Sequence, residues 1–370
     1  MMPPHFPTPM HEALALAEQS IALTEPNPRV GCVIVASDGR VIGRGRTQQA
    51  GGPHAEVMAL RDAESRREIV HGATAYVTLE PCAHHGRTPP CCDALIAARV
   101  GRVIMALEDP FPQVAGAGAA RLRAAGIAVE QGLLAHEARE LNIGFFSRVV
   151  RGRPWVRLKV AVSLDGRTAL PNGVSQWITG PEARTDGHAF RRRASAVLTG
   201  VGTVHDDDPR LDVRLVETPR QPLRVVVDSR LETPVSARLL APPGAVLIYA
   251  AQPHAERGAA LQSCGAEIAF APGAGGKVDL AAMLADLARR GVNELHVEAG
   301  HKLNGSLVRE GLVDEFLVYM APRLLGTGRD LAAFGPLDRL EDALDLRWVS
   351  VERIGGDLRL IARPAGREDF

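Results

Sequence analysis

The chain has 370 residues, enough for two domains that each bury a hydrophobic core. Lysine plus arginine and aspartate plus glutamate both number 43, so no excess of charge points to a nucleic acid or an anionic membrane as partner. No apolar run is long enough to span a membrane, the first residues do not resemble a secretory signal, and five cysteines form no disulfide framework. We therefore expect a cytoplasmic protein that binds neither nucleic acid nor membrane.

The first 150 residues alternate between helical and strand patterns. Apolar residues recur at helical spacing over 9–23, and an apolar strand over 30–35 is followed by a turn and a second strand over 41–47. The same criteria predict helices that begin at His54 and at Pro89-Pro90, and two further helices at 119–125 and 133–145. They also predict strands at 73–79, 102–107 and 127–129. This alternation predicts a layered α/β domain with a mostly parallel sheet.

Two short motifs in this half, Pro53-His-Ala-Glu56 and Pro81-Cys82, carry the residue types of a zinc site. A catalytic zinc ion needs three nitrogen or thiolate ligands and one open position, and His54, Cys82 and either Cys91 or Cys92 supply such a set. Glu56 lies two residues after the histidine, where it can act as a general acid and base without ligating the metal. A structural zinc ion would need a fourth ligand, for which His84, His85 and Cys92 are candidates.

The polar segment Arg151-Gly-Arg-Pro154 predicts the boundary between two domains, and a second series of elements follows it. The expected strands lie at 155–162, 196–199, 223–227, 245–249, 267–270, 294–297 and 316–320. The expected helices lie at 181–193, 279–290 and 302–310. Two strands over 348–351 and 358–362 predict a closing hairpin around Gly355-Gly356.

Several polar or glycine-containing stretches follow the strands of this second half, at 159–168, 175–179, 199–203, 206–210, 228–229 and 298–306. The carboxyl ends of strands line the ligand crevice of α/β proteins. Gly300 and Gly305 stand at a strand-to-helix turn, where free amides could hold a phosphate. The only lysines are Lys159, Lys277 and Lys302. We interpret the preference for arginine as compositional, although such rare use of lysine also suits a specific role. The residues alone therefore predict a nucleotide-type binding domain.

The long spacing from Cys82 to Cys91, with His84-His-Gly-Arg-Thr-Pro-Pro-Cys-Cys92 inside it, closely resembles the deaminase half of the bifunctional deaminase/reductases of riboflavin biosynthesis. The stretches of the second half resemble, in order and spacing, the reductase half of the same enzymes. The resemblance covers nearly the whole chain. It implies an α/β protein with a cytidine-deaminase-like three-layer domain over residues 1–150 and a dihydrofolate-reductase-like domain over residues 154–370.

The resemblance also implies roles for individual residues. In the first domain the zinc ligands fall on His54, Cys82 and Cys91 and the proton-transferring residue on Glu56; Asn27 matches a contact to the pyrimidine base, although Asn27-Pro28 also suits a simple turn. Positions that match NADPH contacts are Ala161, Trp177, Thr203, Asp207, Ser229, Gly300, His301, Lys302, Leu303, Asn304, Gly305 and Ser306. Positions that match contacts to the phosphoribosylamino substrate are Lys159, Ser175, Arg191, Leu211, Arg214 and Glu298. Two arginines suit a phosphate ester.

The chain departs from the family pattern at Thr47, where a histidine is common, and at Phe111, where an asparagine is common. Both changes bear on how the first domain holds the base or sugar of its substrate. In the second domain Asp207, Glu298 and Lys159 are all candidates for the proton donor of the reduction.

The resemblance implies zinc-dependent hydrolytic deamination of 2,5-diamino-6-(5-phosphoribosylamino)pyrimidin-4(3H)-one. NADPH would then reduce the ribosyl group of 5-amino-6-(5-phosphoribosylamino)uracil to ribityl. It also implies a homo-oligomer, a dimer or a tetramer. Two other functions stay open: another zinc nucleobase deaminase fused to an NADPH-binding domain, or a structural zinc domain joined to a nucleotide sensor.

Overall fold

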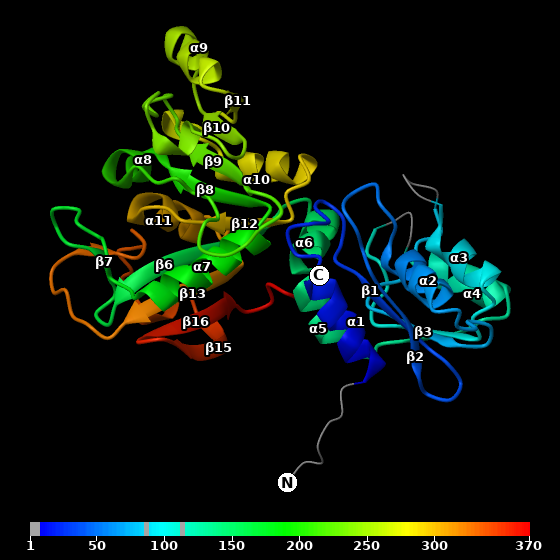
Figure 1. Ribbon diagram of the computed structural model, residues 1–370. Helices are drawn as coiled ribbons and strands as arrows, with labels where there is room; N and C mark the ends of the chain where they lie inside the picture. The colour runs from blue at the N-terminus through cyan, green and yellow to red at the C-terminus, as the bar shows by residue number, and fades with distance from the viewer. Residues whose placement is uncertain (1–7, 85–88, 112–114) are drawn as a thin grey trace. The chain divides into compact units, whose positions relative to one another are not determined.

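The computed structural model describes residues 8–84, 89–111 and 115–370 (Figure 1). His85 and the first residues of the chain, both considered above, lie outside the described residues. The chain divides into two compact units, Met1–Arg151 and Gly152–Phe370. None of the described helices is long and apolar enough to cross a bilayer.

The first unit is built on a five-stranded sheet with the order β2-β1-β3-β4-β5. Its strands are β1 (Gly31–Val35), β2 (Val41–Arg46), β3 (Thr74–Val77), β4 (Arg102–Met105) and β5 (Ala128–Gln131). Strands β3, β4 and β5 are parallel, whereas β1 is antiparallel to both β2 and β3. The hairpin expected from the turn between β1 and β2 is confirmed. The prediction of a mostly parallel sheet holds only for β3, β4 and β5, because β1 is also antiparallel to β3.

Helices cover both faces of this sheet. They are α1 (Pro9–Glu18), α2 (Ala55–Ser65), α3 (Cys91–Ala97), α4 (Ala117–Ala124), α5 (Ala135–Leu141) and α6 (Ile143–Arg151). Figure 1 shows α2, α3 and α4 on one side of the sheet and α1 with α5 on the other. Because side chains alternate along a strand, Val33 and Val35 of β1 pack against Met10 and Leu14 of α1. The unit therefore has three layers, as the resemblance implied.

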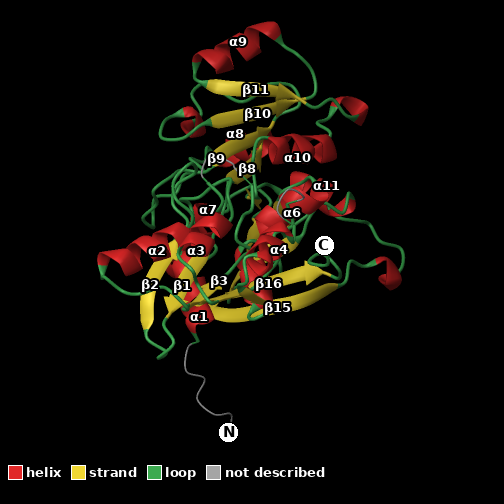
Figure 2. Ribbon diagram, turned by 90° about the vertical axis from the view of Figure 1, so that its right-hand side faces the viewer, coloured by secondary structure: helices red, strands yellow, loops and turns green. Residues whose placement is uncertain are grey.

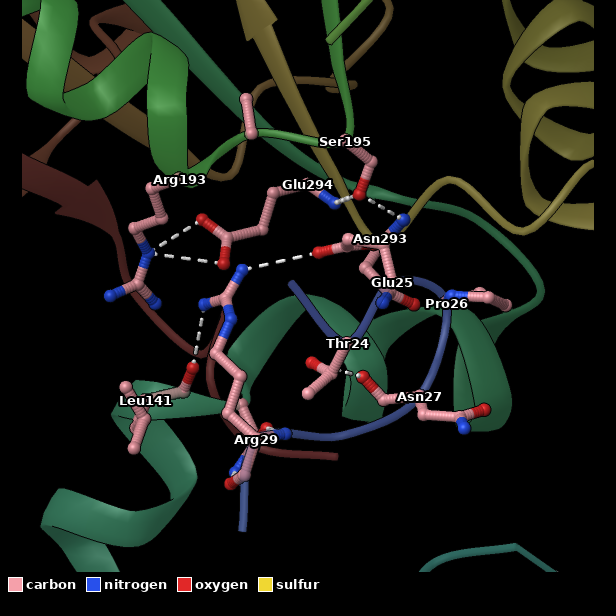
Figure 3. Close-up of polar contacts among 12 residues, drawn as sticks. Thr24, Glu25, Pro26, Asn27, Arg29, Leu141, Arg193, Ser195, Asn293 and Glu294 are labelled. Carbon is pink, nitrogen blue, oxygen red and sulfur yellow. Dashed lines mark hydrogen bonds and ion pairs between the residues drawn. The ribbon is translucent and has the colours of Figure 1, made fainter. Parts of the chain in front are cut away.

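Two helix predictions in this unit are wrong in extent. The helix expected over 9–23 ends at Glu18, and Ser20 beyond it donates a hydrogen bond to the carbonyl of Thr47 at 2.9 Å. The helix expected over 133–145 is broken at Asn142. The side chain of Asn142 accepts from the backbone N–H of Arg29 at 2.8 Å and donates to the carbonyl of Arg29 at 2.9 Å. Figure 3 shows Arg29 also donating to the carbonyl of Leu141. These contacts hold the segment that leads into β1.

The second unit contains a nine-stranded sheet with the order β11-β10-β9-β8-β12-β6-β13-β16-β15. Its strands are β6 (Trp155–Ser163), β8 (Ala196–Gly200), β9 (Leu223–Val227), β10 (Val246–Ala250), β11 (Ala266–Phe270), β12 (Glu294–Val297), β13 (Glu315–Ala321), β15 (Leu346–Ile354) and β16 (Asp357–Pro364). The sheet is parallel from β11 to β13, and the hairpin of β15 and β16 adds two antiparallel strands at the end opposite β11 (Figure 2). Strands β7 (Arg167–Ala169) and β14 (Arg329–Asp330) form a separate small sheet.

Helices again cover both faces. They are α7 (Pro181–Arg193), α8 (Val201–Asp207), α9 (Ala255–Ser263), α10 (Leu280–Arg289) and α11 (His301–Arg309), with short 3-10 turns at Arg238–Leu240, Ala274–Gly276 and Leu340–Asp342. Residues of α10 and α11 pack with Val225 and Leu247 on one face. On the other face, Leu261 of α9 packs with Val226 and Ile248. This α/β arrangement buries both sides of the parallel strands.

Buried polar contacts fix the start of β12, whose carboxyl end leads to Glu298. The hydroxyl of Ser195 accepts from the backbone N–H groups of Asn293 and Glu294, at 2.9 and 3.2 Å (Figure 3). Arg193 donates from Nε to both carboxylate oxygens of Glu294, at 3.0 and 2.8 Å. Glu294 is almost fully buried and also forms an ion pair with Arg157, which in turn pairs with Glu315. Since buried charges need such partners, this network holds the central strands in one register.

Candidate active sites

Three of the predicted metal ligands meet at the ends of separate elements in the first unit. His54 is the residue just before α2, Cys82 lies in the loop after β3, and Cys91 is the first residue of α3. Nδ1 of His54 lies 3.6 Å from Sγ of Cys82 and 3.2 Å from Sγ of Cys91, and the three ligand atoms all lie within 4.8 Å of one another. One nitrogen and two sulfurs at this spacing fit a zinc ion.

Hydrogen bonds explain why the sulfur of Cys82 suits a metal. The backbone N–H of Cys91 donates to Sγ of Cys82 at 3.3 Å. The Cys91 thiol, together with His54 and this amide, lowers the pKa of Cys82 to about 4, although burial opposes the shift. A thiolate is the form of cysteine that binds a metal. The hydrogen bond to Cys82 and burial raise the pKa of the Cys91 thiol, so Cys82 is the thiolate of the pair and Cys91 would release its proton when a metal binds.

Glu56 stands beside this cluster in the first turn of α2 and is only 3% exposed. Burial, and next the charge of Cys82, raise the pKa of its carboxyl group to about 7. A carboxyl group with a pKa near neutrality is suited to taking up and releasing a proton.

The structure separates Cys91 from Cys92, which spacing could not do. Sγ of Cys92 donates to the carbonyl of Pro81 at 3.1 Å, away from His54. His84 lies near Phe111, with ring centroids 6.3 Å apart, and does not join the cluster. Among the described residues the cluster thus has three candidate ligands, which is the number in a catalytic zinc site.

The remaining predicted positions of this unit lie in ordered backbone. Asn27 is half-buried, and its backbone pairs with Thr24 (Figure 3), so its contact to a base stays a prediction. Thr47 is buried, and its N–H donates to the carbonyl of Val30 at 2.9 Å, which extends the pairing of β1 and β2. The N–H of Phe111 donates to the carboxylate of Asp109 at 2.8 Å.

The second unit has a cavity of about 1490 Å³ at the carboxyl ends of its parallel strands. Nearly all of the predicted positions of this unit line it: Lys159, Ala161, Ser175, Trp177, Arg191, Thr203, Asp207, Leu211, Arg214, Ser229, Glu298, Gly300, His301, Lys302, Leu303 and Ser306. Its position agrees with the general location of ligand sites in open α/β sheets.

Glu298 is the centre of charge on one side of this cavity. Its carboxylate accepts from Nε and Nη2 of Arg191, at 2.5 and 2.8 Å, and lies 3.6 Å from Nζ of Lys159. Burial alone would raise the pKa of Glu298, but the charges of Arg191 and Lys159 hold it well below its usual range. Glu298 therefore stays ionised and fixes the two cations in place.

The other side of the cavity brings together the starts of helices α8 and α11 and the end of strand β9. Thr203 of α8 lies beside Gly300, which precedes α11 without a side-chain cap. Ser229 follows β9, and its hydroxyl accepts from the N–H of Val278 at 3.2 Å. Trp177 is 59% exposed, with the Arg184 guanidinium 4.6 Å from the centre of its ring. Burial raises the pKa of Asp207, which accepts from Ser175 at 3.4 Å.

Two predicted positions do not line the cavity. The Asn304 side chain is buried and donates to the carbonyl of Leu331 at 2.8 Å. Gly305 faces the segment at Ala333, because a Cβ at position 305 would lie 2.3 Å from the carbonyl oxygen of Ala333. Both residues hold α11 against that segment.

Sequence reasoning missed several cavity residues, among them Arg184, Arg238 and Arg329. Lys277 was noted only for its rarity. All three lysines of the chain line the cavity, so the scarcity of lysine was a usable signal for Lys277. The arginines gave no such signal, since they are spread along the whole chain.

The fold and the two sites define a zinc-binding domain of the nucleobase-deaminase kind joined to an α/β domain with a nucleotide-sized cavity. Residues 7–107 match the cytidine and deoxycytidylate deaminase zinc-binding region, and residues 154–360 match the RibD C-terminal domain. Riboflavin biosynthesis protein RibD of Escherichia coli is 44% identical over 95% of this chain and 97% of its own length. That of Aquifex aeolicus is 42% identical over 94% and 96%.

Solved structures of similar proteins match both domains of this chain. RibD of Acinetobacter baumannii is 40% identical and superposes with a TM-score of 0.87 over 96% of this chain and 98% of its own. A deaminase/reductase from Thermotoga maritima, with the same coverage, is 32% identical with a TM-score of 0.86. The chain belongs to the RibD family of riboflavin-biosynthesis enzymes, with both a deaminase and a reductase domain.

Proposed function

We propose that this chain deaminates 2,5-diamino-6-(5-phosphoribosylamino)pyrimidin-4(3H)-one and then reduces 5-amino-6-(5-phosphoribosylamino)uracil at its ribosyl group. The observation that carries this proposal is the presence of both sites in one chain. His54, Cys82, Cys91 and Glu56 meet in the first unit, and the Arg191–Glu298–Lys159 cluster lines a cavity in the second. We assign the deaminase to residues 1–150 and the reductase to residues 154–370.

In the deaminase, His54, Cys82 and Cys91 would hold zinc. When bound, the metal would supply a Lewis acid that lowers the pKa of a water molecule. The buried carboxyl group of Glu56 would accept a proton and return it to the departing amino group, and ammonia would leave. Asn27 would contact the base. This assignment explains why Glu56 is buried although it ligates nothing.

In the reductase, NADPH would lie along Ala161, Trp177, Thr203, Asp207 and Ser229 and, at the start of α11, along Gly300, His301, Lys302, Leu303 and Ser306. Asn304 and Gly305 would hold α11 in place without touching the cofactor. The uncapped amides at that helix start suit a phosphate group, and the cavity is large enough for a dinucleotide and a substrate together. When bound, NADPH would supply a hydride to C1′ of the ribosyl group.

The substrate would contact Lys159, Ser175, Arg191, Leu211, Arg214 and Glu298. Arg191 and Arg214 would hold its phosphate ester, since a guanidinium group matches phosphate oxygens. Because Glu298 is held ionised by two cations, we assign it to positioning Arg191 and Lys159 and not to proton donation.

A coupled assay tests the proposal. The zinc-loaded protein receives the diamino substrate and NADPH, and ammonia release and NADPH oxidation are followed together. We expect ammonia to appear first and oxidation to depend on it. Ammonia without oxidation would return the second unit to an unassigned nucleotide binder, and neither signal would overturn the substrate assignment.

We also propose that the protein works in the cytoplasm as a homo-oligomer. The family's place in small-molecule biosynthesis and the five unpaired cysteines support the first part. Light scattering of the purified protein tests the second part, and a monomer at micromolar concentration would contradict it.

A further inference from the structure

His188 lies on α7 directly behind the two arginines assigned to the substrate phosphate. It is 4% exposed and does not line the cavity. Its Nδ1 accepts from the backbone N–H of Arg214 at 3.2 Å, and its Nε2 lies 3.4 Å from Nη1 of Arg191. The ring thus holds the backbone of Arg214 by a hydrogen bond. Because Nε2 then carries the ring proton and a guanidinium group only donates, the approach to Arg191 is a packing contact.

The segment that carries Arg214 has no regular secondary structure, so side chains hold its backbone. Gln221 pairs with both backbone groups of Val213, at 2.7 and 2.9 Å. The carbonyl of Asp212 accepts from Nη1 of Arg191 at 2.9 Å, and the carboxylate of Asp212 accepts from the Arg214 guanidinium at 2.6 Å. His188 adds the tie at Arg214 itself, between this segment and α7.

The ring of His188 must be neutral to make this tie. A neutral imidazole has one acceptor nitrogen. Nη1 of Arg191 already donates to the carbonyl of Asp212, whereas the backbone N–H of Arg214 donates to Nδ1 of His188. Burial, and next the charges of Arg191 and Arg214, lower the pKa of His188 to about 4, so the ring is an acceptor at neutral pH.

We propose that His188 is a positioning residue of the reductase, which sets the distance between Arg191 and Arg214 so that both can hold the 5′-phosphate of the substrate. The inference rests on the proposed function. Two guanidinium groups bind one phosphate tightly only if they already converge, because ordering a loose segment at binding costs affinity. Without His188 the segment at Arg214 would need to be ordered by the ligand itself.

The experiment compares two compounds in the reductase assay: 5-amino-6-(5-phosphoribosylamino)uracil and the same compound without its 5′-phosphate. In His188→Leu we expect KM for the phosphorylated compound to rise roughly 10-fold, since a backbone donor loses its partner. KM for the compound without phosphate and kcat for both should not change. The ratio of the two KM values reports the phosphate site, which a general loss of stability would not alter selectively.

Two polar variants separate the role of Nδ1 from that of size and polarity. Asparagine places an amide oxygen at the position of Nδ1, so His188→Asn should keep the wild-type KM ratio. Glutamine places its amide nearer the position of Nε2, so His188→Gln should behave like His188→Leu. If His188→Leu does not fold, the KM ratios of His188→Asn and His188→Gln are compared with each other instead. Arg192→Ala removes a neighbouring charge of α7 outside the cavity and should leave the ratio unchanged.

The bifunctional chain supplies its own controls. Ammonia release by each variant shows that the chain is folded, and NADPH binding followed by fluorescence shows that the cavity is intact. The inference would be overturned if the KM ratio of both His188→Leu and His188→Gln equalled that of the wild type. It would also be overturned if the KM ratio of His188→Asn differed from that of the wild type as much as that of His188→Leu does. If the wild-type protein reduces neither compound, the proposed function fails instead.

Discussion

Glu56 is a deeply buried carboxyl group in the first turn of α2, beside the three metal-ligand side chains, which come from three separate elements. Changing Glu56 to Gln keeps its size and its hydrogen-bonding capacity but removes the group that carries the proton. We expect ammonia release to fall by about 10²- to 10⁴-fold, the usual contribution of a general acid and base. The zinc content, measured by atomic absorption, should not change. Glu64→Gln on the exposed face of the same helix is the control; activity that survived in Glu56→Gln would remove Glu56 from the mechanism.

His188 also predicts how stability depends on pH. Its pKa is about 4 in the folded chain, below the ordinary value of 6.5, because of burial and then the nearby charges of Arg191 and Arg214, which Glu298 and Asp212 offset in part. The folded state therefore takes up this proton less readily than the unfolded state. The contribution of neutral His188 to the free energy of unfolding is therefore fully present above pH 6.5 and is lost as the pH falls toward 4.

The measurement is urea unfolding of the wild type and of His188→Asn between pH 7 and pH 4. The wild type should lose stability more steeply than the variant over this range, because the variant has no ring to protonate. Other titrating groups are common to both proteins and cancel in the difference. Parallel pH curves would show that His188 titrates normally.

Elements with strong local signals were predicted almost to the residue. The expected ranges for α7, β9 and β12 agree with the structure, because Pro181 starts a helix well, β9 is a mainly apolar run, and β12 alternates polar with apolar residues. Helix α8 was not predicted, since its start contains Gly200 and Gly202, which favour a turn in local reasoning. The break at Asn142 depends on Arg29, which is 113 residues away in sequence, so no local pattern contains it.

The candidate sites likewise contain some residues that local sequence predicts and others that only distant contacts bring together. Residue types and spacing predicted the cluster of His54, Cys82 and Cys91, but spacing left Cys91 and Cys92 equivalent. The choice depends on where α3 begins, because successive side chains of a helix point about 100° apart. His188 is 26 residues away from Arg214, whose backbone it holds, so only the fold shows that contact. Only the fold likewise brings Lys277 to the cavity.

Glu80 organises the connection between β4 and α4. It is 4% exposed, and its carboxylate accepts from the backbone N–H groups of Asp109, Gly116 and Ala119, at 3.2, 3.0 and 2.9 Å. Removing the carboxylate in Glu80→Ala leaves these donors without their partner. We expect the free energy of unfolding of the first unit to fall by about 2–4 kcal/mol.

Glu80→Gln keeps one acceptor oxygen and should lose less. Chemical denaturation followed by circular dichroism measures both variants. Glu64→Ala, an exposed position on α2, should change stability by no more than about 0.5 kcal/mol. Equal stability of Glu80→Ala and the wild type would mean that water satisfies the three amides.

At the scale of the whole molecule, the two activities use separate sets of side chains. The metal ligands and Glu56 all belong to the first unit, and every residue that lines the large cavity belongs to the second. The three lysines are likewise confined to the cavity. Loss of one site therefore need not disturb the chemistry of the other.

Metal removal tests this separation. After dialysis against a chelator, ammonia release should be lost, because His54, Cys82 and Cys91 no longer hold a Lewis acid. When 5-amino-6-(5-phosphoribosylamino)uracil is supplied directly, the rate of NADPH oxidation should stay within about twofold of that of the untreated protein, since no cavity residue belongs to the metal cluster. Adding zinc back should restore ammonia release alone. If the chelated protein instead lost its circular dichroism signal and both activities together, the zinc ion would be holding the fold, and the role of Glu56 as its catalytic partner would no longer be supported.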